Sequence, residues 1–253
     1  MGPMASRLGP HPWPPLTMFV LPAHAEPVFP PVHLASPEGL LAIGGDLSTE
    51  RLLAAYSAGI FPWYNTGQPI LWWSPDPRAV LFPSQLRISR SLKKTLRKAR
   101  FTLSLDTAFS QVIEGCASAP RPQRAAGTWI TAEMKEAYFR LYTLGYAHSV
   151  EAWFEGRLAG GLYGVALGRT FFGESMFTLV SDASKVAFAH LVLQLRAWDY
   201  QMIDCQMRSA HLASLGGTEI PRGEFLTILA AGLAYPTQRG PWRVDETVTH
   251  HEH

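Results

Sequence analysis

Three polar side chains, Glu174, Asp204 and Gln206, lie inside apolar segments with the composition of strands. Because a strand alternates its side chains between two faces, Asp204 and Gln206 are expected to share a face, as are Glu174 and Met176. An unpaired carboxylate in an apolar sheet is costly, so such groups are paired or open onto a cleft. The spacing therefore predicts either a pocket for a cationic group or a buried polar network that fixes strand register.

The composition describes a globular protein with a sizeable core. The chain has 253 residues, 47% of them hydrophobic, which is enough for one large or two modest domains. Its net charge is only +2, so a polyanion would have to be held by a local basic patch. The two cysteines, Cys116 and Cys205, match neither a disulfide framework nor a metal site. No apolar run approaches the ~20 residues of a membrane span, so we expect a cytoplasmic monomer without metal or membrane contact.

The N-terminal part divides into an extension and a small domain. Residues 1–17 are rich in proline and are expected to remain unfolded. Residues 18–77 are expected to form a small N-terminal domain containing a short helix over 49–58.

The small domain also carries aromatic residues on segments that proline keeps from being helical. Aromatic side chains on loops can stack on a nucleobase, each stack contributing ~1–3 kcal/mol, or they can lock two domains together. We assign Trp63 to a ligand, and Trp72 and Trp73 to structure.

A cationic helix follows the strand expected over 78–82. Its basic residues fall at positions i, i+3, i+4, i+7 and i+8, opposite an apolar side, and no acidic residue interrupts the segment 87–100. This pattern favours contact with a nucleic-acid backbone over a solvated surface helix, and a membrane surface is disfavoured because the apolar side lacks aromatic anchors. The candidate nucleic-acid-binding residues are Arg90, Lys93, Lys94, Arg97 and Lys98.

Residues 78–235 alternate between strand and helix patterns, and an irregular tail follows over 236–253. A strand ends at Leu105, Asp106 is expected to cap the next helix, and Thr131 the one after it. The predicted order is strand, two helices, three strands, helix, strand and helix, which indicates an α+β domain with a mainly antiparallel sheet. This order resembles the GNAT acyltransferase fold. The loop 178–184 has no glycine for a coenzyme A pyrophosphate, so we expect no cofactor.

Seven short motifs, in order along the chain, resemble the leucyl/phenylalanyl-tRNA–protein transferase family. Such enzymes transfer leucine or phenylalanine, and less readily methionine, from aminoacyl-tRNA to a protein with N-terminal arginine or lysine, marking it for degradation by the N-end rule. The resemblance implies this activity here. The motifs are Gly-Gly-Asp-Leu at 44–47, Gly-Ile-Phe-Pro-Trp at 59–63, Trp-Trp-Ser-Pro-Asp-Pro-Arg at 72–78, Gly-Thr-Trp-Ile at 127–130, Gly-Glu-Ser-Met-Phe at 173–177, Ile-Asp-Cys-Gln at 203–206 and His-Leu-Ala-Ser-Leu-Gly at 211–216.

The same resemblance implies roles for individual residues. Glu174, Asp204 and Gln206 match the polar catalytic site of the family, and the basic helix matches its tRNA-binding region. Ser209 departs from the larger amide side chain expected at that position. The aminoacyl side chain and the terminal adenosine are expected to contact Trp63, Trp129, Leu162, Phe171, Met176, Phe177 and Phe188.

These roles suggest a mechanism in which Asp204 and Glu174 attract the acceptor while Gln206 orients its amine, with Asp204 promoting proton loss directly or through Gln206. Cys205 is expected to be a buried apolar residue, and His211 a structural one. Two alternatives remain: an acetyl-CoA-dependent N-acetyltransferase with the GNAT fold, and a non-catalytic RNA-binding module.

Overall fold

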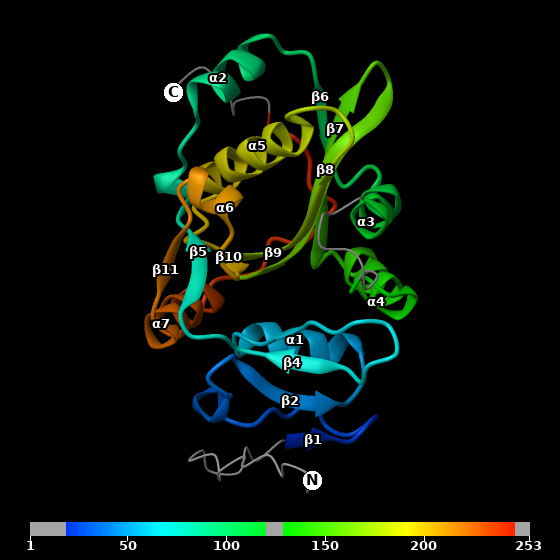
Figure 1. Cartoon of the computed structure of the whole chain (residues 1–253), viewed down its shortest axis with the longest axis vertical. Coiled ribbons are helices and arrows are strands. Elements are labelled where there is room, and N and C mark those ends of the chain that lie inside the picture. Colours follow the sequence, from blue (N-terminus) through cyan, green and yellow to red (C-terminus); the bar gives the residue numbers. More distant parts are fainter. Residues whose placement is uncertain (1–18, 120–128, 246–253) are drawn as a thin grey trace, which may run out of the picture.

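The computed structural model describes residues 19–119 and 129–245, and it contains two sheets that lie one above the other in Figure 1. The predicted unfolded extension 1–17, most of the proline- and arginine-bearing loop after Ala119, and residues 246–253 of the predicted tail lie outside these ranges. Within them, no helix is both long enough and apolar enough to span a bilayer.

The smaller sheet lies at the bottom of Figure 1 and has the strand order β1-β2-β4-β3. A single helix, α1, belongs to this part of the chain and starts where predicted, with the Ser48 hydroxyl accepting a hydrogen bond from Arg51 N. The elements are β1 (Phe19–Leu21), the 3₁₀ turn η1 (Val32–Leu34), β2 (Leu40–Gly44), α1 (Thr49–Ser57), β3 (Phe61–Pro62) and β4 (Leu71–Trp73).

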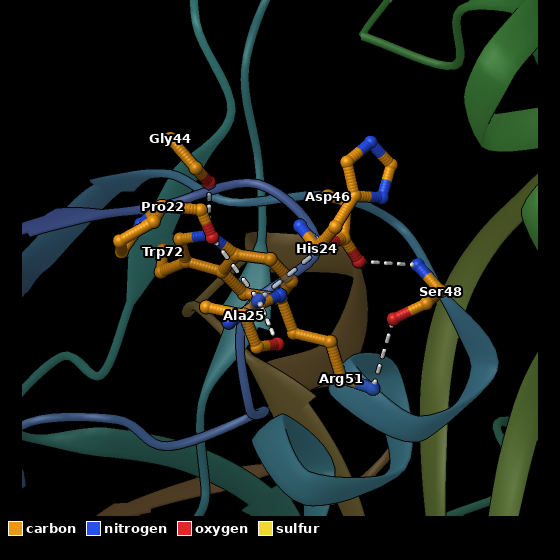
Figure 2. Close-up of polar contacts among 8 residues, drawn as sticks. All are labelled: Pro22, His24, Ala25, Gly44, Asp46, Ser48, Arg51 and Trp72. Atoms are coloured by element: carbon orange, nitrogen blue, oxygen red, sulfur yellow. Dashed lines mark hydrogen bonds and ion pairs between the residues drawn. The ribbon is translucent and has the colours of Figure 1, made fainter.

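Arg51 fastens the first described segment to α1 (Figure 2). Its side chain is 1% exposed, and Nη2 donates to the carbonyl oxygens of Pro22 (3.3 Å) and Ala25 (3.0 Å). The same nitrogen lies 3.4 Å from the carboxylate of Asp46. Burial acts to raise the pKa of Asp46, but hydrogen bonds from Ser48 and other donors outweigh it and hold that pKa well below its usual range. The contacts of Arg51 and Asp46 therefore have a structural role.

The larger sheet has seven strands in the order β11-β5-β10-β9-β8-β7-β6. Strands β9 and β10 run parallel, and the other neighbouring pairs run antiparallel. The strands are β5 (Arg78–Leu81), β6 (Thr102–Leu105), β7 (Ala147–Phe154), β8 (Arg157–Leu167), β9 (Thr170–Thr178), β10 (Met202–Gln206) and β11 (Thr218–Ile220).

Helices cover both faces of the larger sheet (Figure 1). Helix α5 packs on β7 and β8 from one side, and α3 and α4 pack from the other. The predicted α+β class is confirmed, and the predicted elements occur in the predicted order, but the short helix α6 and the edge strand β11 before α7 were not predicted. The remaining elements are η2 (Pro83–Gln85), α2 (Arg90–Arg97), α3 (Phe109–Ser118), α4 (Ala132–Thr143), α5 (Ala183–Ala197), α6 (Ala210–Ser214) and α7 (Arg222–Leu233).

Of the two predicted helix caps in this domain, one is confirmed and one is wrong. Thr131 caps α4 by accepting from Met134 N at 3.2 Å. Asp106 does not cap α3, because its carboxylate is already engaged by β7: Oδ1 accepts from Ser149 N, and Oδ2 lies 2.9 Å from His148 Nδ1. The carboxylate therefore joins the sheet to its surroundings and leaves the helix terminus uncapped by a side chain.

Two adjacent strands are interrupted by bulges at the same level of the sheet. On β9, Ser175 pairs with Tyr163 while Gly173 pairs with the next residue, Gly164, so Glu174 is an extra residue. On β10 the pairing with β5 skips Cys205 in the same way. A bulge reverses the alternation of side chains beyond it and re-aims the residue it contains. The expectation that Asp204 and Gln206 share a face is therefore wrong, whereas Glu174 and Met176 do line the same cavity.

Candidate active site

A cavity of about 370 Å³ lies beside the two bulges, between β8, β9 and β10 and the helices α5 and α6. The carboxylate of Glu174 and the carboxamide of Gln206 face into it. Four of the predicted side-chain pocket residues also line it: Leu162, Phe171, Met176 and Phe188. The cavity thus places an apolar region next to two polar groups.

Glu174 is held by two tyrosines that come from different parts of the chain. Tyr56 on α1 contacts Oε1 at 2.7 Å, and Tyr138 on α4 contacts Oε2 at 2.9 Å. The two tyrosine hydroxyls also form a short contact with each other. Three contacts need three protons, and two tyrosines supply only two, so the triangle is complete when Glu174 carries the third.

The pKa of Glu174 agrees with this proton count. Burial is the largest influence and raises the pKa of the carboxyl to about 7, while hydrogen bonds from Tyr56, Tyr138 and Gln206 lower it without compensating. Asp204 nearby raises it further. A carboxyl with this pKa can gain or lose a proton near neutral pH, which suits a general acid or base.

Gln206 owes its position to the bulge on β10. Its backbone has a φ of 63°, in the left-handed region, and its N–H donates to Asp204 Oδ1 at 2.9 Å. The side-chain Nε2 donates to Glu174 Oε1 at 3.0 Å. Glu174 and Gln206 are therefore brought together, as predicted, and both reach the cavity.

Asp204 is placed differently from the prediction. Its side chain is completely buried and accepts two hydrogen bonds from Arg78 on β5, from Nε at 2.8 Å and from Nη2 at 2.7 Å. The guanidinium of Arg78 lies between the rings of Phe61 and Phe225, 4.8 and 4.5 Å from their centroids. Because both carboxylate oxygens are used, the expected direct attraction of an acceptor by Asp204 is wrong; Asp204 contacts Gln206 through its backbone instead.

Three predicted aromatic contacts lie away from the cavity. Phe177 follows the bulge on β9 and packs on the opposite face, against Gly115 of α3, so its assignment to the side-chain pocket is wrong. Trp129 packs partly buried against the core on that same face. Trp63 lies on the smaller sheet beside Trp73 and is 39% exposed. Among the described residues, none of these three lines the cavity.

Helix α2 has the predicted two-sided character. Leu92 and Leu96 are buried, and Ser89 caps the helix by accepting from Leu92 N at 3.2 Å. None of the five candidate tRNA-binding residues (Arg90, Lys93, Lys94, Arg97 and Lys98) forms an ion pair with a carboxylate of the part of the chain described here. The basic face is consequently open to solvent and to anions.

Sequence reasoning missed two residues that touch Glu174. Tyr56 and Tyr138 are both fully buried. A buried tyrosine hydroxyl needs a polar partner, so two tyrosines on the inner faces of different helices were the available signal. Two further residues near α6 line the cavity. His211 was expected only as a structural residue, and Arg208 was not predicted at all.

Among residues 19–119 and 129–245, no group of three histidine, cysteine or acidic side chains is arranged to hold a metal ion. Cys205 lines the cavity and is only partly buried, and burial raises the pKa of its thiol well above the usual range. The thiol therefore stays protonated near neutral pH and is a poor nucleophile.

Comparison with known proteins adds a consistent result. Residues 80–230 match the family model described as leucyl/phenylalanyl-tRNA protein transferase, and residues 45–76 match the model for its N-terminal domain. A protein of Nitrosospira multiformis named leucyl/phenylalanyl-tRNA–protein transferase is 57% identical over 87% of this chain and 95% of its own. One of the same name from Azoarcus sp. is 60% identical over 85% of this chain and 90% of its own.

Solved structures are much less similar. L-PGS from Bacillus licheniformis has a TM-score of 0.36 at 10% identity, covering 67% of this chain and 54% of its own. A GCN5-related N-acetyltransferase from Kribbella flavida has a TM-score of 0.30 at 11% identity, covering 67% and 59%. These scores are too low to bear on function.

Proposed function

This chain belongs to the leucyl/phenylalanyl-tRNA–protein transferase family, and on that premise we propose how its cavity performs the transfer. The protein is an aminoacyltransferase that moves leucine or phenylalanine from aminoacyl-tRNA to the N-terminus of a protein. We propose that acceptors begin with arginine or lysine and that the transfer marks them for degradation. The observation that supports the assignment of this site is the apolar cavity directly beside Glu174 and Gln206.

The donor side chain fits the apolar part of the cavity. Leu162, Phe171, Met176 and Phe188 form a hydrophobic lining, and burying a leucine or phenylalanine side chain there contributes roughly 1.5–3 kcal/mol. Methionine is apolar and flexible, so it fits the same space. The exposed ring of Trp63 is available to stack on the terminal adenosine.

The reaction requires one nucleophilic attack and one proton transfer. The acceptor amine attacks the carbonyl carbon of the aminoacyl ester, an amide C–N bond forms, and the C–O bond to the ribose breaks. The proton lost by the amine ends on the ribose oxygen. Glu174 in its ionised form accepts a hydrogen bond from the amine, and the Gln206 carboxamide orients it. Good positioning alone can contribute ~7–11 kcal/mol.

Asp204 acts in this scheme as a positioning residue. Its Oδ1 accepts the N–H of Gln206 and thereby holds the bulge that turns the carboxamide toward Glu174. The two hydrogen bonds from Arg78 fix Asp204 in turn. We assign the basic face of α2 to the tRNA backbone, because cationic side chains that contact phosphates release the counterions condensed on the RNA and so favour binding. The residues of this face are Arg90, Lys93, Lys94, Arg97 and Lys98.

The proposal is tested by incubating the protein with [³H]Leu-tRNA and a peptide that begins with arginine. We expect labelled peptide to form, and treatment of the tRNA with RNase to abolish it. A parallel reaction with labelled acetyl-CoA should leave the peptide unlabelled. Failure of leucyl transfer would refute the proposed reaction, and acetylation would favour the acetyltransferase alternative.

The tRNA assignment has its own measurement. Replacing Lys94 and Arg97 by glutamine should weaken Leu-tRNA binding and reduce the dependence of log Kd on log salt by about 1–2 units, since each phosphate contact adds ~0.7–0.9 to that slope. Lys135, which is paired with Glu114 on the opposite side of the sheet, provides the matched control Lys135→Gln. An unchanged slope would place the tRNA elsewhere.

A further inference from the structure

A second cavity, of about 320 Å³, adjoins the first across the turn that leads into α6. The two cavities share four residues, Cys205, Arg208, Ser209 and Leu212, so only this turn and the β10 bulge separate them. Among the described residues that line the second cavity, the charged ones are Arg208 and Glu219. The second cavity is thus polar where the first is apolar.

Glu219 is in cross-strand register with Gln206 of the first cavity. On the edge strand β11, Glu219 pairs with Ala79 of β5, and Ala79 pairs on its other side with Gln206 of β10. Neighbouring strands are ~4.8 Å apart, so the backbones of Glu219 and Gln206 are separated by roughly 10 Å. The residue between them carries only a methyl group. Glu219 and Gln206 therefore line adjoining cavities whose shared boundary is formed by Cys205, Arg208, Ser209 and Leu212.

The present partner of Glu219 indicates what kind of group it binds. Arg208 Nη1 lies 3.3 Å from Glu219 Oε2, with the Arg208 side chain 70% exposed and the Glu219 side chain 33% exposed. An ion pair this open to water contributes only ~0–1 kcal/mol. A cation arriving with a substrate can replace Arg208, whose side chain is free to turn to solvent. The Arg208 guanidinium occupies the position that a substrate guanidinium would take.

The other two acidic residues near the site are less suited to this task. Asp204 is buried and gives both oxygens to Arg78. Glu174 completes its contacts with Tyr56 and Tyr138 as a neutral carboxyl. Of the acidic side chains lining either cavity in the described chain, Glu219 is the one with a cationic partner that a substrate can displace.

We infer that Glu219 binds the cationic side chain of the first residue of the acceptor and so selects N-terminal arginine or lysine. The inference rests on the proposed function and adds the group that reads the acceptor. The α-amine lies at Gln206 and Glu174, and the long side chain extends across Ala79 toward Glu219. Short or acidic first residues leave Glu219 paired with Arg208 and gain nothing from it.

The test measures steady-state transfer of [³H]leucine to peptides that differ only in their first residue. In Glu219→Gln, KM for the Arg-starting peptide should rise ~3–5-fold, the loss expected for an ion pair that stays partly open to water, while kcat and KM for Leu-tRNA stay unchanged. The matched control is Glu224→Gln, the same change at an exposed position on α7 that lines neither cavity.

Two further variants keep the result interpretable. Arg208→Ala removes the competing cation and leaves Glu219 in place, so KM for the Arg-starting peptide should stay equal or fall up to about fivefold. Glu219→Lys should reverse the preference, raising transfer to an Asp-starting peptide relative to an Arg-starting one.

The outcomes separate the two proposals. If the wild type labels the Arg-starting peptide but Glu219→Gln leaves its KM unchanged, the role of Glu219 is overturned and the transferase function stands. A large rise in KM on Arg208→Ala would also overturn it, because Arg208 itself would then be needed. If the wild type labels no peptide, both proposals fail together.

Discussion

Two glutamates on the larger sheet have different surroundings: Glu151 is buried, and Glu174 is partly exposed. Glu151 on β7 is fully buried and accepts hydrogen bonds from the hydroxyls of Ser104 (2.5 Å), Thr107 (3.0 Å) and Ser149 (2.5 Å) and from the N–H of Ala108 (3.3 Å). Four polar groups thus contact the two oxygens of this carboxylate. Glu151 lines neither cavity beside α6 and joins β6, β7 and the start of α3.

Glu174 on β9 is the contrasting case. It lies on a bulge, faces a cavity and is held by the hydroxyls of Tyr56 and Tyr138. Both glutamates stand in apolar strands, so a position in an apolar strand does not distinguish a structural carboxylate from a functional one. The distinguishing features of Glu174 are a bulge that re-aims the side chain and open space beside it. Asp204, fully paired with Arg78, belongs with Glu151.

The largest expected effect comes from removing the carboxylate of Asp204, which is buried and fully paired with Arg78. Asp204→Ala leaves Arg78 buried without its partner, which should lower the free energy of unfolding by ~3–5 kcal/mol and reduce transfer at least ~10²-fold. The double variant Arg78→Met, Asp204→Leu should recover most of the stability in urea unfolding but not the transfer. Recovery of both would show that Asp204 serves only the fold.

Glu174→Gln should lower the transfer activity much more than Glu151→Gln does. Without a group that accepts a hydrogen bond from the amine in its ionised form, kcat/KM for the peptide should fall ~10²-fold, measured by labelled leucine transfer. Glu151→Gln is the control, and its specific activity per folded molecule should stay near that of the wild type. Equal losses in the two variants would remove the distinction between them.

Glu174→Gln should raise the free energy of unfolding at pH 7.5, although it lowers activity. The pKa of Glu174 is about 7 in the folded state against an ordinary 4.5, so its contribution is fully present below pH 4.5 and is lost as pH rises toward 7. Glu174→Gln cannot ionise and should be ~1–3 kcal/mol more stable than the wild type at pH 7.5, with the difference vanishing near pH 4. Glu151→Gln should be ~1–3 kcal/mol less stable at pH 7.5, because it loses acceptors for buried donors. Urea unfolding at the two pH values measures both.

The smallest effect is the pH dependence of the reaction. Because the ionised form of Glu174 accepts the amine hydrogen, protonation of Glu174 alone should lower kcat/KM about tenfold per pH unit below pH 7. The acceptor amine, with an ordinary pKa of ~7.7–8.0, also loses reactivity as pH falls. The inflection from Glu174 should be absent in Glu174→Gln while that of the amine remains. A profile unchanged by this substitution would assign the proton transfer to another group.

Local sequence patterns were sufficient for the architecture and for part of the site. The order of strands and helices, the cationic side of α2 and the cap at Thr131 were all predictable, because each depends on spacing within a few residues. Four of the residues expected in the side-chain pocket, Leu162, Phe171, Met176 and Phe188, line one cavity, and their assignment to the donor side chain stays a prediction.

Tertiary structure decided the other features of the site. The physical reason is that the repeat of apolar residues along one segment does not show which distant segment it will pair with. One extra residue on each of β9 and β10 reverses alternation, which moved Phe177 to the far face and turned Gln206 toward Glu174. The pairing of Arg78 with Asp204 joins residues that are distant in sequence, and so does the contact of Tyr56 with Glu174. By itself, the sequence determined which residues could do the chemistry; packing decided which carboxylate is sealed and which one faces the cavity.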